Sequence, residues 1–418
     1  MENLSEHPVY GVSVKNFGAR GDGGGDDAPS IQKALDSGSP LVVVPGGCYR
    51  IGRTLRIHSG TRLHVHPRAT LVQADGFGRD HTCFLLTNSD HERGNCDITI
   101  EGGIWDGNNR NNQRGPDQPG AYTGVLTCFF NVKRLTLRDL QLSNPVSYYT
   151  RFSRVSNFLV EHIRFRTMEL RPNQDGIHLG GECQDGIIRH IDGRGTGTPG
   201  DDVVALNADD ANQRAQNLGK VNGFIRRIHI HDLYAEDCHT FVRILSAPSP
   251  ISQIEIENVH GGCQVCALNL DAARGCLVPV FDEQDPRYAN GIGTISDIRI
   301  RDLRIHKSSA KADKPLLDIL TRMRNFTVED LIRDHRIDAH PAAPTMRMGM
   351  LPNTDLVLEG LTPDQIDPEQ LIGSGRLTRM ESTHPAPLYR MQRRLAFDET
   401  SRLMHGGFQR LHVSEGCG

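Results

Sequence analysis

The sequence predicts an all-β protein whose chain winds into a single-stranded, right-handed parallel β-helix. Three observations predict this class: a recurring strand phrase, a glycine count of 43 and an aromatic content of only 6%. The phrase reads apolar-x-apolar-x-polar-apolar and recurs along the chain. Its copies are ITIEGG from Ile98, LTLRDL from Leu135, FLVEHI from Phe158, GIIRHI from Gly186, IHIHDL from Ile228, IEIENV from Ile254, IRIRDL from Ile298, FTVEDL from Phe326 and LVLEGL from Leu356.

The spacing of these copies favours a coil over other repeat folds. The shortest offsets between copies are 23–28 residues, and the longer ones fit a repeat that carries an insertion. Alternation within each copy buries one face of the strand, and equivalent strands of a parallel coil stack about 4.8 Å apart. A β-propeller is the structural alternative, but each of its blades needs about 40–45 residues and four strands.

The N-terminal residues predict a cap for the open end of the coil, because an uncapped parallel stack exposes an edge that can aggregate. The segment PSIQKALDSG reads as an amphipathic helix over about residues 27–37, with Asp27 as its N-cap and Gly38 as its stop. The capped β-helix is expected to occupy residues 1–361. Residues 362–418 lose the repeat and are expected to pack on the coil or extend from it as a tail.

Charge and composition limit which classes of binding partner and which cellular locations the sequence predicts. The net charge of −4 argues against a nucleic-acid partner recognised by bulk charge, and no apolar run is long enough to predict a membrane span. The first residues lack a basic segment followed by an apolar one, so a cytoplasmic location is expected, or a secreted one if an upstream signal was removed. Cys263 and Cys266 form a C-x-x-C that Cys276 could join, although buried reduced thiols are the favoured interpretation.

Several motifs, in order along the chain, carry a resemblance to a known family. NFGARGDGGGDDAPSIQKALD, followed by LVVVPGGCYRIG, resembles the N-terminal signature of the pectin-lyase-like β-helix superfamily. IEGGIWDGNN, NQDGIHL at 173–179, GDDVVALN at 200–207 and FVRIL at 241–245 resemble successive segments of glycoside hydrolase family 28, the polygalacturonases. The resemblance spans most of residues 10–360. It implies a role in carbohydrate metabolism, as a hydrolase that cleaves O-glycosyl bonds of a plant or microbial oligosaccharide.

The same motifs depart from the family at two points. The G-H-G segment of the family has no clean match, and His239 in DCHTF stands nearest to its place. The lysine of the family's R-I-K strand is replaced by Leu245. Because that lysine contacts a uronate carboxylate in the family, the resemblance does not extend to a galacturonide substrate.

The resemblance implies that Asp175, Asp201 and Asp202 are the catalytic residues. Asp175 stands at the entry of one strand and Asp201-Asp202 at the entry of the next, so the three should gather at one edge of a sheet. Asp201 or Asp202 would be the general acid, and the other would activate water together with Asp175. An inverting enzyme holds its two carboxyl groups about 6.5–9.5 Å apart. The alternative is that all three are ordinary turn residues. No metal or cofactor is expected.

Six further residues are candidates for substrate binding: Asn173, His178, His239, Arg243, Tyr148 and Tyr149. His178 and Arg243 alternate out of phase with the core residues beside them and should point to the solvent face. One of the two tyrosines should face the cleft and stack on a sugar ring, while its neighbour faces the core. Asn173 would orient Asp175 or simply form the turn.

Two other classes of function fit the same residues. A polysaccharide lyase or epimerase acting on a uronate-containing glycan would use Arg243 as its base, with calcium held by acids such as Asp209 and Asp210. Without that role, Asp209 and Asp210 are expected to be solvated turn residues. A noncatalytic glycan-binding β-helix would keep the fold without the chemistry. The partner is an oligosaccharide or polysaccharide in each case, and the C-terminal tail could join copies of the chain into a homo-oligomer.

Overall fold

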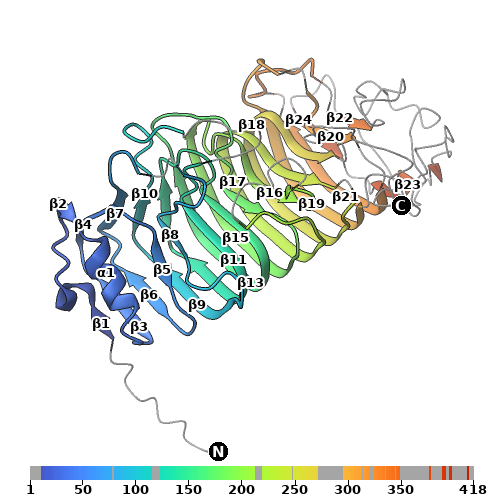
Figure 1. Cartoon of the computed structure of the whole chain (residues 1–418). Coiled ribbons are helices and arrows are strands. Elements are labelled where there is room, and N and C mark those ends of the chain that lie inside the picture. The colour runs from blue at the N-terminus through green and yellow to red at the C-terminus, as the bar shows by residue number, and fades with distance from the viewer. Residues whose placement is uncertain are drawn as a thin grey trace, which may run out of the picture.

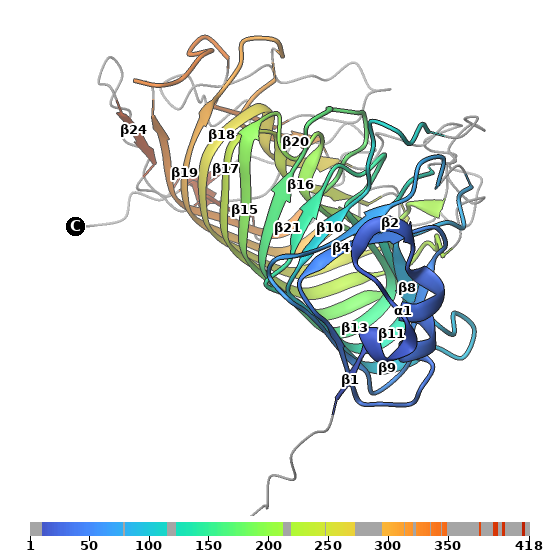
Figure 2. The same cartoon turned by 90° about the vertical axis from the view of Figure 1, so that its left-hand side faces the viewer.

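The computed structural model shows a rod of stacked coils (Figure 1). It describes residues 11–77, 80–114, 123–211, 219–246, 248–271, 295–312, 314–320, 323–334, 336–343 and 345–348, with short strands at 376–377, 388–391, 395–397 and 412–413. Strands of successive coils lie side by side along the rod (Figures 1 and 2). Within these ranges, no helix has the length and apolar character needed to cross a membrane.

Strands make up nearly all of the regular structure. The first half of the rod contains β1 (Val12–Ser13), the 3-10 helix η1 (Val14–Phe17), β2 (Asp22–Asp26), α1 (Ala28–Leu35), β3 (Leu41–Val44), β4 (Gly47–Ile51), β5 (Leu55–Ile57), β6 (Arg62–Val65), β7 (Ala69–Gln73), β8 (Leu86–Asn88), β9 (Asn95–Glu101), β10 (Ile104–Asp106), β11 (Thr127–Arg138), β12 (Gln141–Ser143) and β13 (Thr150–Arg166). The second half contains β14 (Ile177–Leu179), β15 (Cys183–Thr196), β16 (Asp202–Asn207), β17 (Ile225–Leu245), β18 (Ile251–Asp271), β19 (Ile295–Lys307), β20 (Leu317–Leu320), β21 (Met323–Asp334) and β22 (Met346–Met348). Four short strands follow: β23 (Arg376–Leu377), β24 (Leu388–Met391), β25 (Leu395–Phe397) and β26 (His412–Val413).

Three parallel sheets form the walls of the rod. Sheet 1 contains β3, β6 and β9 and then parts of β11, β13, β15, β17, β18, β19 and β21. Sheet 2 contains β2, β4, β7, β10 and β12, and continues into the later parts of β13, β15, β17, β18 and β19. Sheet 3 contains β5, β8, the starts of β11 and β13, then β14, β16, the ends of β17 and β18, β20 and β22. All of these pairings are parallel, so the predicted coil is observed and the propeller alternative is wrong.

The polar residue before the last apolar position of each strand phrase lies at a corner of the coil. Asp139, His162, His190, Asp232, Asn258, Asp302 and Asp330 occupy this place and have φ values of 53–60°. In the first copy the position is Gly102, with φ of 79°. Asp, Asn and His are the non-glycine residues that adopt the left-handed region most readily, because their short polar side chains bond locally. The polar letter of the phrase therefore marks where the chain leaves sheet 1 for sheet 2.

The apolar letters of the phrase point inward and form a continuous core. Ile228, Ile254 and Ile298 stand in the same register on neighbouring strands, and all three are buried. Trp105 is also fully buried, and its Nε1 donates to the carbonyl oxygen of Gly102 at 3.0 Å. Each such side chain contributes about 1.5–3 kcal/mol by leaving water, so coil stacking supplies most of the stability.

The expected N-terminal helix is present but shorter than predicted. α1 spans Ala28–Leu35, lies at the N-terminal end of the rod (Figure 2) and contacts η1, β4 and β5. Asp27 precedes it, but the Asp27 carboxylate accepts hydrogen bonds from the backbone of Arg20 and Gly21 rather than from the helix. The Ala28 N–H is bound instead by Asp26 Oδ1, at 3.0 Å. Asp27 therefore stands at the N-cap position as predicted, but its side chain does not cap the helix. The capping role of α1 for the coil stays a prediction.

Acidic and basic side chains line the outer face of sheet 1, in what we call the charge ladder, and their signs alternate except where Arg189 stands beside His231. Its members stand in one register: Glu101, Arg138, Glu161, Arg189, His231, Glu257, Arg301 and Glu329. Neighbouring members form ion pairs, such as Arg189–Glu161 at 2.6 Å and Arg301–Glu257 at 2.7 Å. Opposite charges on directly adjacent strands stabilise that pairing, so the ladder favours the observed register over a slipped one.

Replacing Glu101 with glutamine should destabilise the N-terminal coils by about 1.5–3 kcal/mol, the range for hydrogen bonds to charged groups. The carboxylate of Glu101 is nearly buried and binds Arg62, His64 and Arg138. Burial alone would raise the pKa of Glu101, but Arg138, Arg62 and His64 outweigh it and lower that pKa from 4.5 to about 2. Because the folded-state value is depressed, the stabilisation is complete above pH 4.5 and fades as the pH falls towards 2.

Denaturant midpoints of the wild type and E101Q, measured from neutral pH down to pH 2, test this prediction. The gap between the two proteins should narrow through the acid range. D97N is the matched control, since Asp97 and Arg134 form an exposed pair that solvent screens and that should contribute much less than the Glu101 cluster. A loss of stability in E101Q that is independent of pH would contradict the stabilising role of the ionised Glu101 carboxylate.

The C-terminal part of the chain is described only in short strands. The ninth copy of the phrase, from Leu356, lies outside the described residues, as does most of the predicted tail 362–418. β24 and β25 pair antiparallel with β21, the last described strand of sheet 1. The role predicted for the tail in joining copies of the chain stays a prediction.

Candidate functional site

The three predicted catalytic acids lie at one edge of sheet 3. Asp175 stands in the turn before β14, Asp201 directly precedes β16 and Asp202 begins it. The Gly176 N–H donates to the carbonyl oxygen of Asp202 at 2.8 Å, which fixes Asp175 and Asp202 one coil apart in the same register. The structure therefore brings the three acids together as the spacing predicts, while their catalytic roles stay predictions.

Asp201 and Asp202 share one arginine and one histidine. Nε and one Nη of Arg243 lie 3.0 and 3.1 Å from the two carboxylate oxygens of Asp202. The same guanidinium is 3.7 Å from Asp201 Oδ1, and Nδ1 of His239 is 3.3 Å from that oxygen. Burial would lower the pKa of Arg243, but Asp202, then Asp201 and Asp175, raise it above its ordinary value. Arg243 is thus a fixed cation in this cluster.

Asp175 belongs to a second, almost completely buried chain of charges. Its Oδ2 lies 2.6 Å from Nδ1 of His178, and Nε2 of the same ring lies 2.8 Å from Asp210 Oδ2. The ammonium group of Lys220 contacts that Asp210 oxygen as well. Four side chains therefore link in series as Asp175–His178–Asp210–Lys220, which we call the buried relay.

The relay corrects two expectations. His178 does point away from the core, but it is fully buried rather than on a solvent face, because Tyr148 stacks on its ring at 4.4 Å. Asp209 and Asp210 are not solvated turn residues, since they are 3% and 5% exposed. Asp209 Oδ2 accepts a hydrogen bond from the Ser249 N–H at 3.1 Å, and Asp210 binds His178. Alternation predicts which way a side chain points, but not what covers it.

The remaining candidates are placed as follows. Both tyrosines lie in the segment directly before β13. Tyr149 lies in the main core, where its hydroxyl donates to the carbonyl oxygen of Arg166, and Tyr148 belongs to a separate apolar cluster. The alternation is as predicted, but Tyr148 is only 1% exposed and stacks on His178 rather than lining an open cleft. Asn173 forms the turn with φ of 62°, and its side chain accepts from Arg114. His178, and not Asn173, is therefore the residue that holds Asp175.

Sequence reasoning missed two cations of this site. Lys220 completes the buried relay, and its ammonium also lies 4.9 Å from the centre of the Tyr148 ring. Arg151 stands in register with His178 on the neighbouring strand and is 1% exposed. Arg151 follows the same out-of-phase rule that singled out Arg243, so alternation could have found it. Lys220 could not be found that way, because it lies outside any strand.

Some side chains of the cluster reach solvent and others do not. The side chains of Asp201, His239 and Arg243 are 16%, 29% and 15% exposed, whereas that of Asp202 is 1% exposed. Asp201, Asp202 and His239 each offer one ligand atom, and these atoms lie within 4.8 Å of one another. They could hold a metal ion, although Arg243 already contacts both oxygens of Asp202. A sugar hydroxyl or carboxylate would reach the cluster first at Asp201 and His239.

The burial of the C-x-x-C motif disfavours a metal centre there. The side chains of Cys263 and Cys266 are buried, and these residues are 0% and 1% exposed. Burial raises the pKa of the Cys263 thiol above its ordinary value, which disfavours the thiolate that a metal requires. The favoured interpretation as buried thiols agrees with the structure, and Cys276 lies outside the described residues.

Comparison with known proteins shows which superfamily this chain is related to. Residues 11–108 match the family of rhamnogalacturonase A/epimerase, pectate lyase-like proteins. Together with the polygalacturonase match below, this confirms the predicted relationship to the pectin-lyase-like, family-28-related superfamily.

The proteins that this chain resembles include both enzymes and phage appendage proteins. The preneck appendage protein of Bacillus phage PZA is 36% identical over 109 residues, which cover 26% of this chain and 12% of that protein. A polygalacturonase of Persea americana is 25% identical over 231 residues, covering 50% of this chain and 46% of the enzyme. The crystal structure of an exopolygalacturonase from Thermotoga maritima aligns with a TM-score of 0.49 at 16% identity, over 82% of this chain and 91% of that chain. The chain thus spans less than half the length of these two curated relatives.

Proposed function

We propose that the protein is a glycoside hydrolase that cleaves a plant or microbial oligosaccharide by carboxylate acid and base catalysis. The observation that carries the proposal is the gathering of Asp175, Asp201 and Asp202 at one edge of sheet 3, beside the partly buried Arg243. Glycosidic cleavage needs one carboxyl group to protonate the leaving oxygen and another to activate water. The polygalacturonase match supports the same chemistry.

The contacts support different proposed roles for the three acids. Arg243 makes its two short contacts with Asp202 and only a longer one with Asp201, so the cation stabilises the ionised form of Asp202 more than that of Asp201. Asp175 is held by His178 within the buried relay. Asp201, the most exposed of the three acids, is therefore the general acid, and Asp202 with Asp175 orients and activates the water. The inverting geometry stays part of the proposal.

The test is cleavage of a glycan panel in water enriched in oxygen-18, followed by mass analysis of the products. The panel should contain galacturonans, rhamnogalacturonans and neutral oligosaccharides, since Leu245 replaces the family's lysine. Hydrolysis adds one labelled oxygen to a product, and we expect that result for at least one glycan. An unsaturated, unlabelled product would establish a lyase on the same scaffold instead. The absence of any cleavage across the panel would remove the enzymatic proposal.

A noncatalytic glycan-binding role is the second candidate. Two observations favour it: Asp175 and Asp202 are only 4% and 1% exposed, and the phage relatives are appendage proteins. Binding without cleavage in the same panel, unchanged in D201N, would support this role. The cytoplasmic location and a saccharide partner remain proposals in both cases.

A further inference from the structure

A histidine pair and a glutamate pair face each other on the outer face of sheet 1, away from the candidate catalytic site. The strand phrase IHIHDL in β17 places His229 and His231 on the same face, and IEIENV in β18 does so for Glu255 and Glu257. The register pairs His229 with Glu255 and His231 with Glu257. Two imidazoles and two carboxylates therefore form a square on adjacent parallel strands.

The square has the atoms and the spacing of a metal site. His229, Glu255 and Glu257 each offer one ligand atom, and these atoms lie within 4.8 Å of one another. Nε2 of His229 is buried, has no hydrogen-bond partner among the described residues and lies 3.8 Å from Glu257 Oε1. An imidazole nitrogen with two carboxylate oxygens is a ligand set that zinc and other divalent transition metals accept.

Surrounding groups already orient these ligands. Arg301 binds Oε2 of Glu257 at 2.7 Å and leaves Oε1 facing His229. The His231 ring lies 4.5 Å from that of His229, and its Nδ1 bonds Asp232 Oδ2 at 2.8 Å. Asp232 thus fixes the His231 ring beside the proposed ligand His229, and Arg301 fixes the proposed ligand Glu257.

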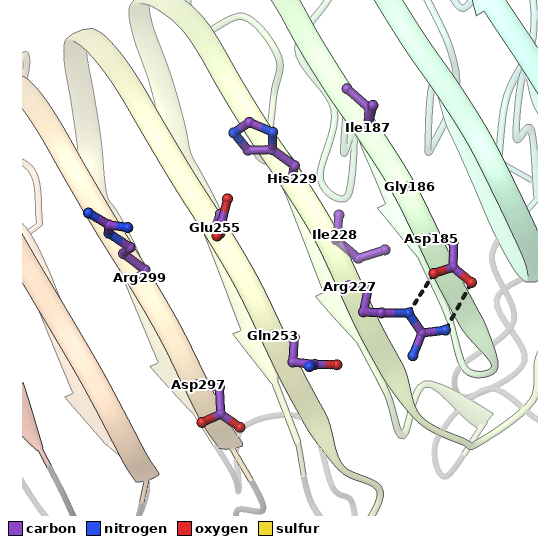
Figure 3. A pocket seen from close by; sticks show the side chains of 10 residues that line it. All are labelled: Asp185, Gly186, Ile187, Arg227, Ile228, His229, Gln253, Glu255, Asp297 and Arg299. Carbon is purple, nitrogen blue, oxygen red and sulfur yellow. Dashed lines mark hydrogen bonds and ion pairs between the residues drawn. The ribbon is translucent and has the colours of Figure 1, made fainter.

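The site is accessible from solvent. His229 and Glu255 line a surface groove of about 590 Å³ that also contains Arg227, Gln253 and Arg299. Figure 3 shows His229 and Glu255 on neighbouring strands, with Arg299 on the strand beyond. The side chain of His229 is 37% exposed and that of Glu257 is 18% exposed. Because Nε2 of His229 is itself buried, the imidazole ring would rotate to meet an ion that arrives from the groove, while the coil stays in place.

From this geometry we infer that His229, Glu255 and Glu257 form a divalent transition-metal site, with His231 beside it. The ion replaces the weak His229–Glu257 contact by bonds to both residues and ties β17 to β18 across the coil. The site lies on sheet 1, whereas the candidate catalytic acids lie on sheet 3, so it stands independently of the proposed hydrolysis.

The test is calorimetric titration of the tag-free, chelator-treated full chain with Zn²⁺, after alkylation of exposed thiols such as Cys48. We expect one zinc ion at this site, and H229Q and E255Q should each weaken its binding by at least about 10-fold, as loss of even an outer support does. Zinc should also raise the melting temperature of the wild type but not of H229Q.

Two variants locate the bound ion. H162Q removes an exposed histidine of the same outer surface and should leave zinc binding unchanged. H239Q removes the histidine of the other possible ligand set, Asp201, Asp202 and His239, and should also retain the sheet 1 site. Zinc binding lost in H239Q but kept in H229Q would overturn the inference, and so would the absence of any binding at millimolar zinc.

Discussion

Replacing Asp201 with asparagine is expected to lower the rate of glycoside hydrolysis by about 10²–10⁴-fold, the usual contribution of a positioned general acid or base. Asparagine keeps the size of the side chain but cannot donate a carboxylic proton to the leaving oxygen. The fold should tolerate the change, because Asp201 is the most exposed acid of the cluster and its contact with Arg243 is 3.7 Å long. Turnover of whichever glycan the panel identifies is the measurement.

D201N is a cleaner test than D202N. Asp202 is 1% exposed and both of its oxygens contact Arg243, so its replacement would also leave a poorly compensated cation and destabilise the protein. D97N, at an exposed acid in another coil, is the control for nonspecific effects. Full hydrolytic activity in D201N would falsify the assignment of Asp201 as the acid, even if the protein proves to be a hydrolase.

Replacing Asp210 with asparagine is expected to destabilise the protein by about 3–5 kcal/mol, the cost of removing one partner of a buried ion pair. Asp210 binds both His178 and Lys220, and the side chains of these two residues are fully buried. The neutral amide would leave the Lys220 ammonium in low dielectric without this carboxylate. Urea or guanidinium midpoints give the change in the free energy of unfolding.

The neighbouring residue supplies a matched control for D210N. Asp209 is equally buried, but the bond that it accepts from the Ser249 N–H survives in D209N, since an amide oxygen also accepts. We expect D209N to lose much less stability than D210N. Equal midpoints for D210N and the wild type would show that the buried relay contributes nothing to the fold.

The β-helix was predictable because it depends on a pattern of apolar and polar residues within each strand phrase. Alternation within the strand phrase determines which side chains enter the core, and residues in the left-handed backbone region, such as Asp232 and Asn258, determine where the chain turns from sheet 1 to sheet 2. The charge ladder could also have been predicted. The residue directly before each corner residue, at the fourth position of the phrase, changes from Glu101 to Arg138 to Glu161 in the first three copies. Each of these features depends on residues a few positions apart.

The candidate site was only partly predictable. One coil length between Asp175 and Asp202 was enough to expect them at one edge of a sheet, and the register confirms that placement. The buried relay was missed because Asp210 and Lys220 lie outside the strands, so that alternation does not predict where their side chains point. His178 was therefore expected on a solvent face, although it binds two carboxylates in the interior.

The sequence by itself determined the coil, its strands, its corners and the common edge of the three acids, because hydrophobic alternation and backbone preference act over a few residues. Only the tertiary structure decided that Arg243 binds Asp202 more closely than Asp201, that His178 supports Asp175, and that His229 faces two glutamates. These contacts join residues that are close only after stacking. Their strength depends on distance and burial, which no local pattern encodes.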